Sequence, residues 1–103
     1  ASFELLPERA LAGHPPARRL LVDDVYRPLA AAGGELLATA TGFLDNGCAV
    51  EPTARALFVH ANTVRYRLGR VSEQVGWDAT DARDGLMLHM AIIVGRLRTH
   101  PGD

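Results

Sequence analysis

The feature that most constrains the fold is a stripe of apolar residues near the middle of the chain. Its members recur at i, i+4, i+7 and i+11, which places them on one face of an α-helix. They are Val64, Leu68, Val71 and Val75. Gly76 follows the stripe, and glycine commonly occurs directly after a helix. The pattern predicts a helix over about residues 61–75 with one buried face and one free face.

A short helix of about eight residues is expected just before it. Pro52 is tolerated in its first turn, where backbone N–H groups have no partners within the helix, and we expect it to end near Leu57 or Phe58. Two helices separated by three or four residues must cross steeply, and Ala54 is the small residue that lets them approach. The residues expected to close a small core beneath the turn are Leu57, Val59, Val64 and Leu68. The pair is typical of a helix-turn-helix.

The N-terminal third of the chain also has helical signals. A short helix is possible after Pro7, and Pro15-Pro16 can open a longer one, which we expect Pro28 to kink or end. Its apolar residues at helical spacing are Leu21, Val25 and Leu29. A break at Gly33-Gly34 precedes a further helix, which closes at Asn46-Gly47. The apolar stripe of that helix is Leu36, Leu37, Ala40, Phe43 and Leu44.

The last predicted helix begins at Thr80 or Asp81, either of which can accept hydrogen bonds from free N–H groups. It carries the stripe Leu86, Met90, Ile93 and Leu97, with Met87, Ala91 and Val94 beside it. An apolar surface on more than one side favours self-association through this helix. Because no alternating run of β-branched or aromatic residues indicates a strand, the sequence predicts an all-α fold, a small helical domain.

Composition restricts the class of protein. A chain of 103 residues, 48% hydrophobic and 22% charged, is expected to form one domain. No apolar run approaches the length of a membrane span. The N-terminus has neither an initiator Met nor a secretion signal, and Cys48 has no cysteine partner. We therefore expect a piece of a longer cytoplasmic protein.

The candidate chemistry is binding, and we expect no enzyme, cofactor or metal site. The histidines are scattered, and Cys48, which has no paired base, is interpreted as a small, partly buried residue. The histidines are His14, His60, His89 and His100. The net charge of −1 does not support nucleic-acid binding. From Thr53 to Val75, however, the sequence contains four arginines and only one acidic residue, Glu73. Basic charge is therefore concentrated around the predicted helix-turn-helix.

The free face of the helix over 61–75 offers groups that can read DNA. At about 100° per residue, Asn62, Tyr66, Gly69 and Glu73 lie opposite the apolar stripe. An amide suits adenine, and guanidinium groups suit guanine or phosphate. His60 is expected to cap the helix or to touch a phosphate. The candidate DNA-binding residues are His60, Asn62, Thr63, Arg65, Tyr66, Arg67 and Arg70. The alternative is that the arginines form only a solvated helix face.

The segments VEPTARALFVHANTVRYRLGRV and DARDGLMLHMAI resemble the C-terminal helix-turn-helix domain of the PucR family of bacterial transcriptional regulators, which is akin to the CdaR sugar-diacid regulators. The heptapeptide NTVRYRL is the most specific part. The similarity covers about residues 36–97, and LLPERALAG resembles the end of a GGDEF-like or linker region.

The resemblance implies a helix-turn-helix similar to that of Fis, an N-terminal sensory domain elsewhere in the protein, and double-stranded DNA as partner. The family's recognition residues map onto Asn62, Thr63, Arg65, Tyr66 and Arg67. We expect residues 1–34 to be a linker and helix, and residues 35–99 to be the DNA-binding domain.

This chain departs from the family at two positions, and from many other helix-turn-helix units at a third. Ala49 stands where the family often has Ser, and Ala61 where it often has Pro, so a helix cap and a preset first turn are lost. Phe58 occupies a turn position where many helix-turn-helix units carry Gly. The competing interpretation is a helical protein-interaction or dimerisation module that does not bind DNA. A DNA-binding homodimer would reconcile the two, because most operators are two-fold symmetric.

Overall fold

The computed structural model describes residues 15–99, and all regular secondary structure in that range is helical. The elements are α2 (Pro15–Leu20), the π-helix η1 (Leu21–Tyr26), α3 (Arg27–Ala31), α4 (Leu36–Asp45), α5 (Val50–Leu57), α6 (Ala61–Val75) and α7 (Ala82–Thr99). The prediction of an all-α domain is confirmed. The possible helix after Pro7 and the residues His14 and His100 lie outside the described range.

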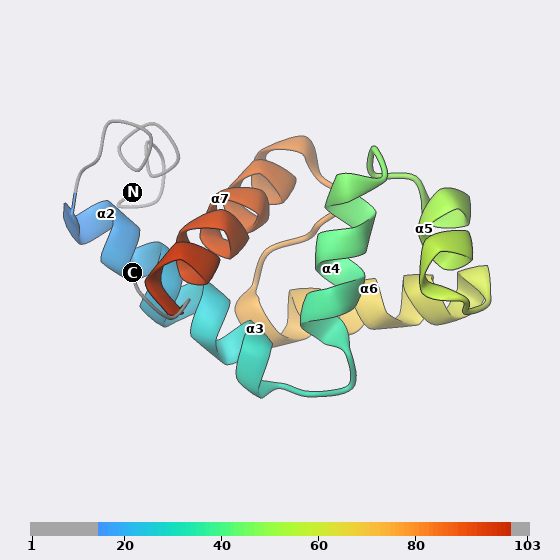
Figure 1. The fold of residues 1–103 in the computed structure, drawn as a ribbon, viewed down its shortest axis with the longest axis horizontal. Coiled ribbons are helices and arrows are strands. Elements are labelled where there is room, and N and C mark those ends of the chain that lie inside the picture. The colour runs from blue at the N-terminus through green and yellow to red at the C-terminus, as the bar shows by residue number, and fades with distance from the viewer. Residues whose placement is uncertain (1–14, 100–103) are drawn as a thin grey trace.

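The first three elements form one continuous helical segment (Figure 1). Of the two expected effects of Pro28, a kink or an end, the helix does not end there. Instead the backbone N–H of Arg27 donates to the carbonyl of Val22, five residues back, and α3 continues to Ala31. Proline has no N–H to donate, so a helix that contains it lacks one backbone hydrogen bond. A wider π-turn is one way in which the helix can continue without that bond. The segment ends before Gly33, whose φ of 72° is left-handed.

Helices α4 and α5 lie where the sequence predicts them. In α4, Leu36, Ala40 and Phe43 are buried. Helix α5 starts after Ala49, which has an extended backbone and makes no side-chain cap. The hydroxyl of Thr53 donates to the carbonyl of Ala49 at 2.7 Å, but the first N–H groups of α5 gain no side-chain acceptor from Ala49. The loss of a cap expected at Ala49 is confirmed.

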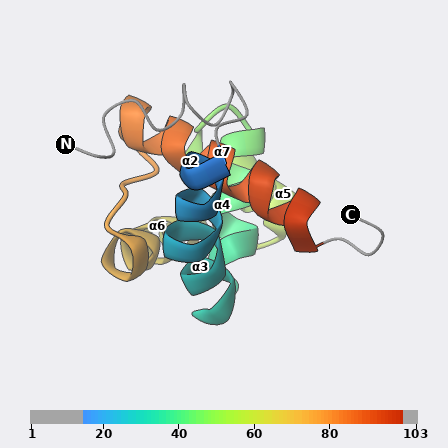
Figure 2. The same cartoon turned by 90° about the vertical axis from the view of Figure 1, so that its left-hand side faces the viewer.

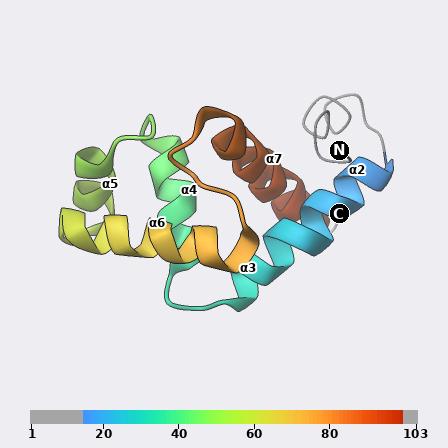
Figure 3. The same cartoon turned by 180° about the vertical axis from the view of Figure 1, so that it is seen from behind.

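Helices α5 and α6 form the predicted helix-turn-helix, joined by residues 58–60 (Figure 3). Ala54 of α5 is buried, as its predicted place at the crossing requires, and the apolar stripe of α6 is buried at Val64, Leu68 and Val71. The bounds of α6 match the predicted 61–75, and Gly76 caps its C-terminus with a φ of 77°. The hydrophobic pattern therefore determines both the helix and the face that it buries.

The connection to α7 is closed by side-chain hydrogen bonds. Asp81 accepts from the N–H of Asp84 at 3.0 Å, the geometry of a helix N-cap. The hydroxyl of Thr80 donates to Asp78 at 2.6 Å and its N–H donates at 2.9 Å. These two bonds favour the carboxylate and lower the pKa of Asp78 below its usual value.

Helix α7 packs against the core through the second of its two apolar stripes, the one that contains Met87, Ala91 and Val94. The buried residues are Met87, Leu88, Ala91, Ile92 and Val94. Leu86, Ile93 and Leu97 are instead 43%, 42% and 54% exposed. The sequence identified both apolar stripes of this helix without saying which one the core would bury. Both faces of α7 are apolar, so periodicity alone could not choose between them.

The buried face of α7 crosses the N-terminal helical segment (Figure 2). There Leu21, Val22, Val25 and Leu29 join the same hydrophobic cluster as α7. The ring of Tyr26 occupies the space that a β-carbon at Gly95 would need. One hydrophobic core thus contains residues from both sides of the domain boundary expected between residues 34 and 35. That boundary stays a prediction. Within residues 15–99 no helix is long and apolar enough to cross a membrane.

Candidate nucleic-acid interface

The face of α6 that does not touch the core carries the residues predicted to read DNA. Asn62, Arg65 and Tyr66 are exposed, and the Tyr66 side chain is 69% exposed. Asn62 and Tyr66 lie nearly opposite Val64, Leu68 and Val71, and Arg65 lies at the edge of the same face, about a quarter turn from that stripe, because each residue advances the helix by about 100°. Gly69 adds no side chain in the middle of this face, and a β-carbon there would meet nothing within 4 Å. The helix therefore presents a polar face from whose centre, at Gly69, no side chain projects.

Asn62 and Arg65 form a pair on this face. The guanidinium Nη1 of Arg65 donates to Oδ1 of Asn62 at 2.9 Å. This bond uses one guanidinium nitrogen and the amide oxygen, so the Asn62 amide nitrogen and the other guanidinium nitrogens take no part in it. The pair orders two side chains that would otherwise lose rotamer freedom on binding. Both present donors near the start of α6.

His60 caps α6, as one of its two predicted roles required. Its Nδ1 accepts a hydrogen bond from the backbone N–H of Asn62 at 3.0 Å. An accepting Nδ1 has no proton, so the neutral ring carries its proton on Nε2. The exposed imidazole can donate from Nε2 while Nδ1 holds the first turn of the helix.

The two flanking arginines already have acidic neighbours. Arg67 Nη2 lies 3.2 Å from Oε2 of Glu35, and its Nη1 lies 3.5 Å from the hydroxyl of Thr39. The Arg67 side chain is only 20% exposed, against 70% for Glu35. Arg70 Nη1 lies 2.7 Å from Oε1 of Glu73, one turn further along α6. Arg67 joins α6 to the start of α4, whereas the Arg70 contact stays within α6.

The predicted residues therefore fall into three places. His60 is at the N-terminus of α6, and Asn62, Arg65 and Tyr66 lie on its outward face. Thr63, Arg67 and Arg70 lie along one flank, where together with Tyr66 they line a hollow beside the turn between α3 and α4. The sequence did not indicate Glu35 or this turn as neighbours of α6.

Phe58 is a second feature that the sequence only hinted at. Its side chain is 95% exposed, and its φ of 58° is left-handed. Its position is one where other helix-turn-helix units carry Gly, which was the available signal. The backbone adopts there the left-handed conformation that glycine adopts without strain, although the residue is Phe.

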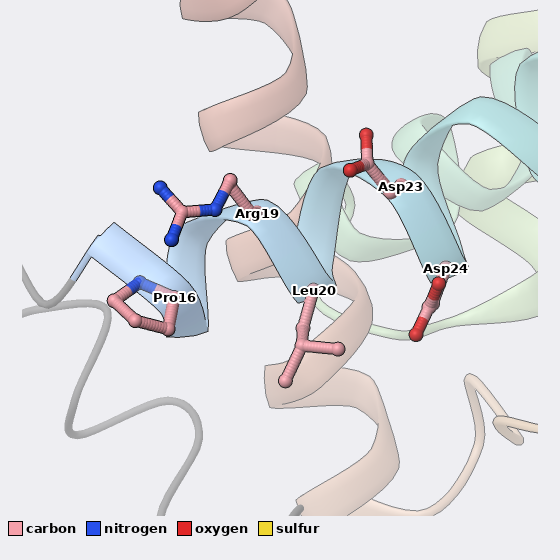
Figure 4. A pocket seen from close by; sticks show the side chains of 5 residues that line it. All are labelled: Pro16, Arg19, Leu20, Asp23 and Asp24. Carbon is pink, nitrogen blue, oxygen red and sulfur yellow. The ribbon is translucent and has the colours of Figure 1, made fainter.

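Other candidate chemistry lies away from α6. Cys48 is exposed, in a left-handed backbone conformation, so its interpretation as partly buried was wrong. A hollow on α2 and η1 is lined by Pro16, Arg19, Leu20, Asp23 and Asp24 (Figure 4). Its carboxylates and its guanidinium carry opposite charges. Among residues 15–99, no three His, Cys, Asp or Glu residues are grouped as metal ligands would be.

Residues 36–94 match the PucR C-terminal helix-turn-helix domain. The chain belongs to the PucR family. The match covers α4 through most of α7, including both helices of the helix-turn-helix and the candidate residues of α6. The chain thus contains the helix-turn-helix domain of a family whose named relatives are transcriptional regulators.

Solved and curated relatives agree with the PucR assignment. The crystal structure of a regulator of polyketide synthase expression from Bifidobacterium adolescentis is 48% identical, with a TM-score of 0.88 over 93% of this chain and 38% of that one. The proline-responsive transcriptional activator PutR of Bacillus subtilis is 35% identical over 60 residues, 58% of this chain and 15% of the relative.

An uncharacterized protein of Mycobacterium tuberculosis is 53% identical over 94 residues, which make up 91% of this chain. This chain spans 23% of that relative's length. The curated relatives therefore contain far more sequence than the PucR-type domain described here.

Proposed function

We propose that this domain binds double-stranded operator DNA sequence-specifically, with α6 as the recognition helix in the major groove. The observation that carries the proposal is the outward face of α6, where Asn62, Arg65 and Tyr66 are exposed while the opposite face is buried. A helix fits the major groove, and amide and guanidinium groups can pair with base edges there.

We assign different roles to the candidate residues. Asn62, Arg65 and Tyr66 lie where they would face base edges, and His60 can donate from Nε2 to a phosphate next to the N-terminus of α6. Thr63, Arg67 and Arg70 lie on the flank, the position of groups that contact the sugar-phosphate backbone. These two classes contribute differently, because base contacts set specificity and phosphate contacts set general affinity.

We further propose that two copies associate weakly through α7. The support is the outward stripe of Leu86, Ile93 and Leu97, whose side chains stay about half exposed. An isologous contact through one helix gives the two-fold symmetry that paired half-sites require. In this proposal residues 35–99 form the DNA-binding unit of a cytoplasmic regulator, and the helical part of residues 1–34 packs on α7.

The experiment that tests the function is a titration with duplex DNA at two salt concentrations. DNA binding must weaken steeply with salt, because cationic side chains release counterions from phosphates. A helical module that only binds protein would show no such salt-dependent affinity for duplexes. Self-association through the exposed α7 stripe is expected both for a DNA-binding domain and for a protein-interaction module, so it cannot distinguish them. The DNA titration can.

A further inference from the structure

A hollow of about 360 Å³ lies between the flank of α6 and the turn that joins α3 to α4. On the α6 side it is lined by Thr63, Tyr66, Arg67 and Arg70. On the other side the wall is formed by Ala32, Gly33, Gly34 and Leu36. In Figures 1 and 3 the turn extends past α6, beside the middle of that helix.

The two walls offer complementary groups to an anion. Thr63, Arg67 and Arg70 recur at i, i+4 and i+7, so they follow one line along α6. Opposite them, Gly33 and Gly34 are exposed and have no side chain, so the main chain itself forms the wall. Both have a left-handed φ, 72° and 60°, which explains why glycines occupy the turn. The hollow thus combines two arginines and a threonine on one wall with the exposed main chain of two glycines on the other.

We propose that this hollow receives a phosphate of the DNA backbone at one edge of the groove that α6 enters. The inference rests on the proposed function. It makes the turn at Gly33-Gly34 a second point of contact, outside the helix-turn-helix itself. Main-chain amides and arginines are common partners of DNA phosphates, and they fix the orientation of a protein on the duplex without reading its sequence.

The acidic neighbours of the two arginines are compatible with this contact. A guanidinium has five N–H donors, and the ion pair with Glu35 and the contact with Thr39 occupy only part of Arg67. Arg70 is held by Glu73 through Nη1 alone. Both arginines therefore keep donors for a phosphate, while the carboxylates hold their side chains at the rim.

The test uses a matched pair of variants, Gly34→Asp and Gly34→Asn. Asp and Asn have the same shape and are the side chains that best tolerate a left-handed backbone. A β-carbon at Gly34 would meet nothing within 4 Å. The two variants thus share any cost in stability and differ only in charge. Melting curves of both proteins confirm that the fold is retained.

The control pair is Gly47→Asp and Gly47→Asn. Gly47 is also left-handed, with a φ of 69° and open space around it. It lies beyond the other end of α4, whose 10 residues separate the two glycines by about 15 Å. That distance exceeds the screening length of about 10 Å at 0.1 M salt.

At Gly34, we expect Asp to weaken binding about three- to tenfold relative to Asn, on cognate and scrambled duplexes alike, since a nearby carboxylate repels the phosphate. At Gly47, Asp and Asn should bind equally. Equal affinities at Gly34, or the same difference at both glycines, would overturn the inference. If inorganic phosphate bound Gly34→Asn more tightly than Gly34→Asp while the two variants bound duplexes equally, the hollow would hold a free ion, and the assignment to DNA would fail. A wild-type domain that showed no salt-dependent duplex binding would instead refute the proposed function.

Discussion

The guanidinium of Arg67 lies 3.2 Å from the carboxylate of Glu35, so α6 is tied to the residue that precedes α4. Arg70, one turn later on the same flank, has its acidic partner within α6. The two arginines look equivalent in the sequence. In the structure only Arg67 links two elements of the fold.

Replacing each arginine with Gln should separate these roles. We expect Arg70→Gln to weaken binding to all duplexes alike and to lower the slope of log affinity against log salt by about one unit, since one phosphate contact is lost. Arg67→Gln should do the same and also lower the melting temperature, because it removes the link between α6 and α4. Fluorescence anisotropy over a salt series and thermal melting measure the two effects. Equal melting temperatures for both variants would show that the link to Glu35 does not stabilise the fold.

The crossing of α5 and α6 depends on a small side chain at Ala54. We expect Ala54→Leu to destabilise the domain by about 1–3 kcal/mol, because the buried site has no room for a larger side chain. Ala56→Leu, at an exposed position of the same helix, should change stability by no more than about 0.5 kcal/mol. Thermal melting compares them. An unchanged melting temperature for Ala54→Leu would mean that residue 54 does not lie at the crossing.

Helix α5 should become more stable when its missing cap is supplied. Ala49 has the extended backbone of an N-cap residue, but no side-chain acceptor. Ala49→Ser adds a hydroxyl that can accept from the first turn and should raise stability by about 0.5–2 kcal/mol. Ala49→Val, which adds no acceptor, should give no such gain. Chemical denaturation of the three proteins tests this, and equal gains for Ser and Val would rule out capping as the cause.

Self-association through α7 should depend on the centre of its exposed stripe. Ile93→Glu would place a carboxylate in the proposed contact and weaken dimerisation about tenfold or more, because the charge must be desolvated. Ala38→Glu, at an exposed position of α4, adds the same charge elsewhere and should leave dimerisation unchanged. Sedimentation velocity measures both. A wild-type domain that stayed monomeric at every concentration, free and on DNA, would exclude the contact.

The sequence predicts a helix and its buried face well where the apolar residues form a single stripe. The stripe from Val64 to Val71 defines α6, because only one face of that helix is apolar. Ala54 is identified as the crossing residue because a short turn demands a small side chain. The capping role of His60 follows from its place directly before the first turn.

Features set by distant residues could not be predicted. Helix α7 is apolar on two sides, and its buried side is chosen where it crosses the N-terminal helical segment, at the contact of Tyr26 with Gly95. Glu35 meets Arg67 across 32 positions of sequence, and no local pattern encodes that pairing. The π-turn before Pro28 could not be predicted either, because a proline can end a helix or be accommodated by a wider turn, and the local sequence does not decide between the two.

The central claim is that the outward face of α6 reads base sequence, and the Asn62–Arg65 pair tests it most directly. Once an operator has been selected from a random library, fluorescence anisotropy compares cognate and scrambled duplexes over a salt series. We expect Asn62→Ala or Arg65→Ala to weaken cognate binding by about 1–3 kcal/mol and non-specific binding much less. Because the two side chains share a hydrogen bond, the double variant should lose less than the sum of the single losses. A ratio of cognate to scrambled affinity that stayed unchanged in both single variants would contradict the account and show that α6 is not the reader.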